Sequence, residues 1–327
     1  MEVSVSPHIR KDWDVKKIML CVVLALIPSA IAGVYYFGYY ALMIIILSIL
    51  SAQITELIGF RLMGKPMEFD GSAVVTGLIL ALILPPTVPL WIPVVGSAFA
   101  IAFFKLLFGG LGKNIFNPAA GGRVFLLLSF GAVMASFPAP ASHGQGIAAT
   151  TAATTAATAA ATTAASPLAS GAAAAYSYMD LFLGRIPGSL GETCKLAILI
   201  GGIILIASGL IDYAVPLVYA LTCVIIAFVA GVDPLYHLLS GGLLFAAFFM
   251  ATDYVTTPIT RRGRIVFAIG LGILTMTTRL LTGTESISFM LLFMNGLVPI
   301  MDRFIIPRSF GEPKKVRIGR GGKKNEQ

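Results

Sequence analysis

Apolar residues gather in ten segments along this chain, separated by polar, glycine-rich or proline-containing connections. Most segments approach the roughly 20 apolar residues that an α-helix needs to cross a bilayer. The pattern therefore predicts an all-α membrane protein with ten transmembrane helices. The predicted spans cover residues 18–37, 40–60, 72–84, 90–108, 123–137, 196–210, 214–230, 237–251, 265–281 and 287–304.

The third and eighth segments, 72–84 and 237–251, are short and adjoin helix-breaking residues. One apolar stretch opens at Gly77 and stops at Pro85-Pro86-Thr87, and the other opens at Gly241-Gly242 and stops at Thr252-Asp253 and Thr256-Thr257-Pro258. Proline removes a helical donor, and free backbone groups are tolerated in a bilayer only where protein or a cavity satisfies them. We expect broken helices here, meeting near the membrane midplane. The alternative is a pair of short proline-terminated helices that line no cavity.

A long polar interruption divides the ten segments into five and five. Within it, every residue from Ala148 to Ala165 is Ala or Thr. An odd number of spans in each half inverts the second half relative to the first, as in inverted-repeat transporters. We therefore predict five regions: an N-terminus 1–17, a first five-helix half 18–137, an intervening loop 138–195, a second five-helix half 196–306 and a basic tail 307–327.

Composition agrees with a membrane protein and orients it. Hydrophobic residues make up 57% of the chain and charged residues 12%, about half the charge of an average soluble domain. With both termini inside, 20 of the 23 Lys and Arg residues, Arg123 included, fall on the inner side and only Arg185, Lys195 and Arg279 fall outside. This bias follows the positive-inside rule. The net charge of +8 thus reflects topology rather than nucleic-acid binding. The basic tail has two further uses open to it, contact with anionic lipid or with an acidic partner.

The cysteines offer no metal chemistry. Cys21, Cys194 and Cys223 form no CxxC pair, so neither an iron–sulfur nor a zinc site can be built from this chain alone. We expect no metal ligand and no catalytic residue acting by itself.

Five short strings occur in order along the chain and together resemble one family. The strings are Ser6-Pro7-His8-Ile9-Arg10, Gly109-Gly110-x-Gly-Lys113-Asn114-x-Phe-Asn117-Pro118-Ala119, Thr163-Ala-Ala-Ser166-Pro167-Leu168, Gly188-Ser189-Leu190-Gly191-Glu192-Thr193 and Met250-Ala251-Thr252-Asp253-x-x-Thr256. In that order, within a ten-span protein, they are similar to RnfD, the D subunit of the Rnf ion-translocating ferredoxin:NAD oxidoreductase, and to the related NqrB. The resemblance runs from about Ser6 to Pro307, and the length and short N-terminus are closer to the RnfD type.

The resemblance implies a fold like that of urea transporters and a covalent flavin. In the family, FMN is joined through its phosphate to a Thr hydroxyl near the outer face. Pro167-Leu168 aligns Ser166 with the acceptor and Thr163 with an earlier hydroxyl. The chain departs from the family pattern twice, because the acceptor is Ser and Ala160 stands where the pattern has Asp. A primary hydroxyl such as that of Ser166 can form the same phosphoester.

Two further groups of residues are candidate cofactor contacts. Gly191, Glu192 and Thr193 precede the sixth span, where backbone N–H groups and hydroxyls can meet a phosphate or the flavin ring. The alternative is a turn and helix start, with Ser189 and Glu192 forming a capping box.

The second group lies near the inner side, where the resemblance implies noncovalent riboflavin. Asn114, Asn117 and Asp253 have side chains that suit the hydrogen-bonding edge of an isoalloxazine ring. The alternative is helix capping or interhelical bonding. Glu56 is a lone acid at membrane depth, either an ion ligand or a partner for Lys105.

These observations support two hypotheses. The first is a flavin-carrying subunit in the cell membrane of a prokaryote, with both termini cytoplasmic and the flavin loop extracytoplasmic. It relays electrons between ferredoxin and NAD, coupled to Na⁺ or H⁺ movement, in a hetero-oligomer with the Rnf-type A, B, C, E and G subunits. The second is a channel or transporter of urea-transporter type without covalent flavin, which would not require the string around Ser166.

Overall fold

The structure is a computed structural model that describes residues 14–64, 69–137 and 176–305. Within them every regular element is a helix, as the apolar pattern predicts. The first half contains α1 (Val15–Phe37), α2 (Tyr39–Leu62), α3 (Ser72–Leu82), α4 (Trp91–Ile101) with its π-helical continuation η1 (Ala102–Leu106), α5 (Pro118–Ser129) and α6 (Gly131–Met134). The second half contains α8 (Tyr178–Leu183), α9 (Lys195–Ala207), α10 (Ala214–Val229), α11 (Pro234–Leu239), α12 (Leu243–Phe245), η2 (Ala246–Met250), α13 (Arg261–Thr282) and α14 (Ile287–Phe304).

Helix starts follow local capping chemistry. The Asp14 carboxylate accepts from Val15 N at the start of α1, and the Thr260 hydroxyl accepts from Gly263 N at the start of α13. Asn117 caps α5 in the same way, with Pro118 at the first helical position, where its missing N–H costs nothing. The three helices begin three to five residues before the predicted apolar spans at residues 18, 123 and 265, because the capped first turns are not part of the apolar pattern.

Four of the described helices, α1, α2, α13 and α14, are long and apolar enough to cross a membrane. Their outward faces are apolar as well. On α2, for example, Ile46, Leu50, Ile54 and Ile58 repeat every four residues and are 42–54% exposed. A soluble protein avoids such stripes, whereas lipid accepts them. The chain is therefore an integral membrane protein with several apolar helices.

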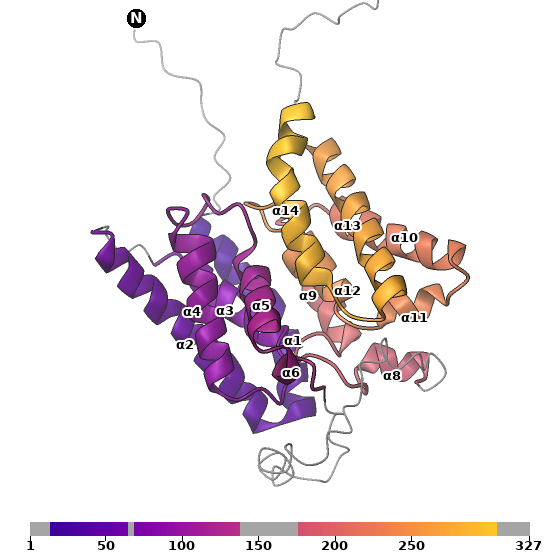
Figure 1. Ribbon diagram of the computed structural model, residues 1–327, viewed down its shortest axis with the longest axis horizontal. Helices are drawn as coiled ribbons and strands as arrows, with labels where there is room; N and C mark the ends of the chain where they lie inside the picture. The colour runs from indigo at the N-terminus through magenta and orange to yellow at the C-terminus, as the bar shows by residue number, and fades with distance from the viewer. Residues whose placement is uncertain (1–13, 65–68, 138–175, 306–327) are drawn as a thin grey trace, which may run out of the picture.

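The two halves use matching helix neighbours (Figure 1). In the first half α2 packs against α3 and α4, and α4 packs against α5. In the second half α10 packs against α11 and α13, and α13 packs against α14. The halves join where α1 packs against α9 and where α5 packs against α14.

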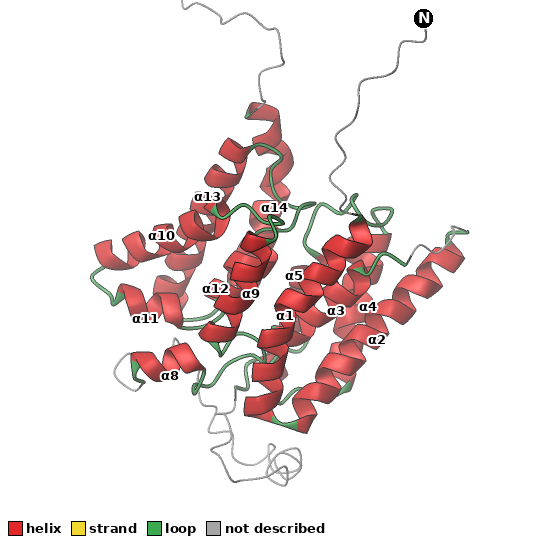
Figure 2. Cartoon of the chain, turned by 180° about the vertical axis from the view of Figure 1, so that it is seen from behind, coloured by secondary structure: helices red, strands yellow, loops and turns green. Residues whose placement is uncertain are grey.

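The start of α1 and the end of α14 lie at one end of the bundle (Figures 1 and 2). The end of α6 and the short helix α8 lie at the opposite end, as both views show. We call these the terminal end and the loop end of the bundle.

Regular helix stops inside the bundle at two places, at the end of the short helix α3 and within the eighth predicted span. Helix α3 ends at Leu82, and the buried residues that follow receive hydrogen bonds from the segment before α9: Gly191 N donates to Leu82 O at 2.7 Å and Leu190 N to Leu84 O at 3.1 Å. The predicted segment 237–251 is divided at residues 240–242, between α11 and α12. Protein groups thus satisfy backbone that the end of α3 leaves free.

Candidate functional site

A buried ion pair joins the two halves at the loop end. Arg123 lies on α5, and its Nη1 donates to Glu192 Oε1 at 2.9 Å, with both side chains 7% exposed. Glu192 belongs to the segment between α8 and α9, which also contacts the interruption after α3. The charge pattern of the sequence predicts Arg123 on the inner side as a topology charge. Which side of the membrane Arg123 faces stays a prediction, but its guanidinium is engaged within the protein, where it bonds to the segment that leads out of the loop.

Lys195, at the start of α9, is fully buried and donates to two backbone carbonyls. One is the carbonyl of Glu192, and the other is that of Gly241, at 2.5 Å, in the interruption between α11 and α12. Lys195 therefore ties the segment before α9 to the broken eighth span.

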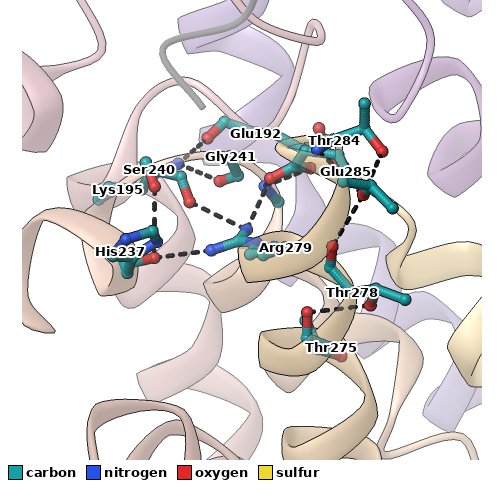
Figure 3. A network of polar contacts seen from close by, with 12 residues as sticks. Glu192, Lys195, His237, Ser240, Gly241, Thr275, Thr278, Arg279, Thr284 and Glu285 are labelled. Carbon is teal, nitrogen blue, oxygen red and sulfur yellow. Dashed lines mark hydrogen bonds and ion pairs between the residues drawn. The ribbon is translucent and has the colours of Figure 1, made fainter. Parts of the chain in front are cut away.

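Arg279 on α13 is the centre of a second set of contacts (Figure 3). Its Nη2 pairs with Glu285 Oε1 at 2.6 Å and reaches the Ser240 carbonyl at 3.2 Å, while its Nη1 donates to the His237 carbonyl at 2.8 Å. Glu285 in turn accepts from Gly242 N through both oxygens, each at 3.0 Å. The broken span is thereby fixed to the end of α13.

Glycines at the interruption allow these side chains to approach the backbone. Gly241 has φ +61°, and a Cβ there would lie 1.3 Å from Glu285 Oε1. A Cβ on Gly242 would lie 2.3 Å from Glu192 Oε1. Both carboxylates therefore occupy space that only glycine leaves open.

A small pocket opens among these groups, with an empty volume of about 350 Å³ that includes solvent at its mouth. Arg123, Thr193 and Lys195 line it, together with both carboxylates, Glu192 and Glu285. Phe137 also lines it and is the last described residue before the Ala/Thr run. The predicted site residues Glu192 and Thr193 thus line one pocket. Gly191 does not line it, and its backbone N–H donates to the Leu82 carbonyl.

The alternative role predicted for this segment is only partly met. Glu192 N donates to Ser189 O at 3.3 Å, which forms the expected turn. The capping box is not formed, because α9 begins at Lys195 and the Glu192 carboxylate turns to Arg123 instead. A local sequence pattern could not reveal this, because Arg123, which binds the Glu192 carboxylate in place of the capping box, lies 69 residues away.

A larger cleft lies toward the terminal end and brings together Asn114, Asn117 and Asp253. Its empty volume is about 880 Å³, open solvent included, and residues of α1, α3, α9 and η2 supply mostly apolar walls. A few polar groups in an apolar cavity of this size are typical of sites for small organic ligands. Both π-helical turns border the cleft, through Lys105 of η1 and Phe248 of η2, and such turns often occur at functional sites.

The three predicted residues of the cleft also have structural bonds. Asn117 caps α5 by accepting from Ala120 N at 3.2 Å and donates to the Met250 carbonyl at 3.4 Å, so both alternative roles, capping and interhelical bonding, are present. Asn114 donates to the Phe116 carbonyl at 3.2 Å, and Asp253 accepts from Thr256 Oγ1 at 3.1 Å within its own turn.

Asn295, fully buried on α14, connects the two loops beside the cleft. With its amide turned so that each atom meets a complementary partner, its oxygen accepts from Asn117 N at 3.0 Å and its nitrogen donates to the Thr256 carbonyl at 3.3 Å. Asparagines near the ends of the two halves therefore bond across their junction.

Glu56 pairs with Lys105, which also donates to the Ser72 hydroxyl. Both charged side chains are 2% exposed. Of the two alternatives for Glu56, the structure forms the ion pair with Lys105.

Four charged residues of the site, Arg123, Lys195, Arg279 and Glu285, were not among those predicted from the sequence. The available signal was charge inside or beside apolar segments, which marks function by default in a membrane. The three cations among them had been assigned to membrane topology, so a role in a site was not predicted for them.

The predicted flavin acceptor Ser166 and its neighbour Thr163 lie outside the described residues, so their assignment stays a prediction. In the described parts of the chain, no group of three or more His, Cys, Asp or Glu side chains could hold a metal ion.

Comparison with known proteins assigns nearly the whole chain to one family. The profile of the NQR2, RnfD, RnfE family matches residues 2–311. The D subunit of the Na⁺-translocating ferredoxin:NAD⁺ oxidoreductase complex of Acetobacterium woodii is 42% identical over 318 residues, covering 96% of each chain. Its counterpart in the proton-translocating complex of Clostridium ljungdahlii is 40% identical, covering 94% of this chain and 96% of that protein. The D subunit of the ion-translocating oxidoreductase complex of Stutzerimonas stutzeri is 41% identical over 91% of this chain and 92% of that protein. This chain belongs to the NQR2, RnfD, RnfE family.

Proposed function

We propose that this chain is the D-type membrane subunit of an ion-translocating ferredoxin:NAD oxidoreductase. The observation that carries the proposal is the match of nearly the whole chain to the D subunits of such complexes. The chain relays electrons between partner subunits of types A, B, C, E and G and does not complete the reaction alone. The relatives named for sodium and for protons are almost equally similar to it, so overall identity does not select the coupling ion.

The proposed topology has ten spans in two inverted halves, with the urea-transporter type of architecture. Its support is the matching set of helix neighbours in the two halves, the short third span and the interruption of the eighth span. The start of α1 and the end of α14 share one end of the bundle, which agrees with two cytoplasmic termini (Figure 1). The interrupting loop 138–195 then belongs to the extracytoplasmic side. We propose the same five regions: the N-terminus, two five-helix halves, the loop between them and the basic tail.

The proposed covalent cofactor is FMN, attached to Ser166 through a phosphoester, with Thr163 as the alternative acceptor. Bound flavin would supply the electron-carrying chemistry. The polar pocket at the loop end fits a phosphate-bearing group, because it combines buried cations with a buried hydroxyl, that of Thr193, which has no hydrogen-bond partner among the described residues. Phe137 connects this pocket directly to the loop.

The proposed second flavin is riboflavin in the cleft at the terminal end. Asn114, Asn117 and Asp253 would orient the polar edge of the ring, and the apolar walls would exclude water from its faces. The volume and composition of the cleft fit a ring system of this kind.

Two experiments test the proposed function. Deleting the gene should abolish ferredoxin-dependent NAD reduction by isolated membranes, and the wild-type chain should restore it. Unchanged activity in the deletion strain would show that the chain is not part of this reaction. In a denaturing gel, the purified chain should fluoresce as a flavoprotein band.

Matched variants then identify the acceptor. Ser166→Ala should lose the fluorescent band, while Thr163→Ala should keep it, because each removes one hydroxyl and adds no bulk. A dark wild-type band would rule out covalent flavin and favour the channel or transporter hypothesis. Fluorescence lost only in Thr163→Ala would move the attachment to that residue.

A further inference from the structure

The charges around the small pocket do not balance. Three cations, Arg123, Lys195 and Arg279, face two carboxylates, Glu192 and Glu285, and the side chains of the four paired residues are at most 12% exposed. Each arginine is paired with one glutamate. Lys195 is left with backbone carbonyls as its described partners, so the cluster carries one surplus positive charge.

A buried ammonium group without a counter-ion is costly. The carbonyls of Glu192 and Gly241 offset part of this cost with their dipoles, yet they supply no negative charge. An ammonium group has three donors, and two of those of Lys195 are used by these carbonyls. The remaining donor and the surplus charge both favour an anion beside Lys195.

Further donors at the same pocket also need a partner. Thr193 Oγ1 and Arg123 Nε are buried without a hydrogen-bond partner among the described residues, and both residues are at most 5% exposed. Buried polar groups of native proteins are nearly always paired. Helix α9, 13 residues long, begins here without a side-chain cap, so its first N–H groups and positive dipole end add to the same preference. The carboxylates that share the pocket are neutralised by their arginines.

We propose that the pocket between Arg123, Thr193 and Lys195 binds a phosphate-class oxyanion. Lys195 supplies the surplus charge, and Thr193 and Arg123 supply the unpaired donors. The phosphate has two candidate sources: the phosphoester of a flavin carried by the chain itself, or free inorganic phosphate. The first source rests on the proposed function, whereas the oxyanion site does not.

The test uses the full-length Ser166→Ala chain, purified in detergent without covalent flavin. Inorganic phosphate should raise its unfolding temperature in a saturable way, beyond the effect of sodium chloride at matched ionic strength, because a ligand that binds only the folded state stabilises it. Adding Thr193→Val keeps the shape and removes the hydroxyl, and should weaken phosphate binding about tenfold. Adding Lys195→Met should remove the phosphate effect. The matched control, Lys113→Met, removes an exposed lysine elsewhere and should leave the effect intact.

The outcomes separate the two sources. If the flavin-loaded wild-type chain gives no phosphate shift while Ser166→Ala does, the flavin phosphoester fills the pocket. Equal shifts in both chains assign the pocket to free phosphate. A phosphate effect no larger than that of chloride in Ser166→Ala, or an effect unchanged by Thr193→Val, overturns the proposal. Failure of covalent flavinylation appears separately, as a dark band in the denaturing gel.

Discussion

Arg123 and Glu192 are 69 residues apart in the chain, and their side chains meet at 2.9 Å inside the bundle. One comes from a helix of the first half and the other from the segment that enters the second half. The pair therefore connects the segments on either side of the long Ala/Thr run. It also holds one wall of the pocket in which we place an oxyanion.

Removing one member of this pair should cost more than removing both. Arg123→Met leaves the Glu192 carboxylate buried and unpaired, and should destabilise the protein by about 3–5 kcal/mol. The double variant Arg123→Met with Glu192→Gln should recover much of that loss, because no lone charge remains. Thermal unfolding of the purified protein in detergent measures both. A double variant less stable than Arg123→Met would contradict this account.

Gly241 should be far less tolerant of alanine than a glycine of similar backbone conformation. Gly231 has φ +72° with nothing near its missing Cβ, so Gly231→Ala should cost only the left-handed strain, about 1–2 kcal/mol. Gly241→Ala bears the same strain, and its Cβ would also overlap Glu285 and displace it from Arg279. The difference in unfolding temperature between the two variants therefore measures the overlap of the new Cβ with Glu285 alone. Equal effects would mean that Glu285 moves aside freely.

Glu56 and Lys105 should behave as a coupled structural pair beside the cleft. Lys105→Met should destabilise the protein by about 3–5 kcal/mol, because it leaves Glu56 charged at 2% exposure. Adding Glu56→Gln to Lys105→Met should restore stability, and a double-mutant cycle of unfolding temperatures gives the coupling. Independent, additive effects would instead favour Glu56 as an ion ligand.

Asn114 provides the cleanest test of riboflavin in the cleft. Asn114→Leu removes the polar amide and should lower the noncovalent flavin released on denaturation about tenfold, as expected when a bound polar group loses its partner. Asn117 is less suitable, because its loss also uncaps α5. Lys113→Met, in the same loop and exposed, is the matched control and should retain its flavin. Unchanged flavin in Asn114→Leu would remove this residue from the site.

The helices could be predicted largely from the residues within each apolar segment. Each of the ten predicted apolar segments contains helix in the structure, because a helix satisfies its own backbone and a continuous apolar run is enough to specify it. The capping role offered as an alternative for Asn117 is likewise local, and the structure forms it at the start of α5. The structure differs from the prediction where a residue distant in sequence replaces a local partner, as where Glu192 pairs with Arg123 and does not form a capping box. The predicted helical segment 123–137 is also divided into two helices, α5 and α6, at Phe130.

The sequence by itself determined that the chain is helical, apolar and divided by a long interruption, and its ordered motifs indicated its family. Only the tertiary structure decided which charges meet. Arg123, Lys195 and Arg279 read as topology charges along the chain, yet folding gathers them at and beside one pocket with Glu192 and Glu285. The physical reason is range: helix formation depends on neighbours within a few residues, whereas a buried charge is stabilised by whichever partner packing brings within about 3 Å.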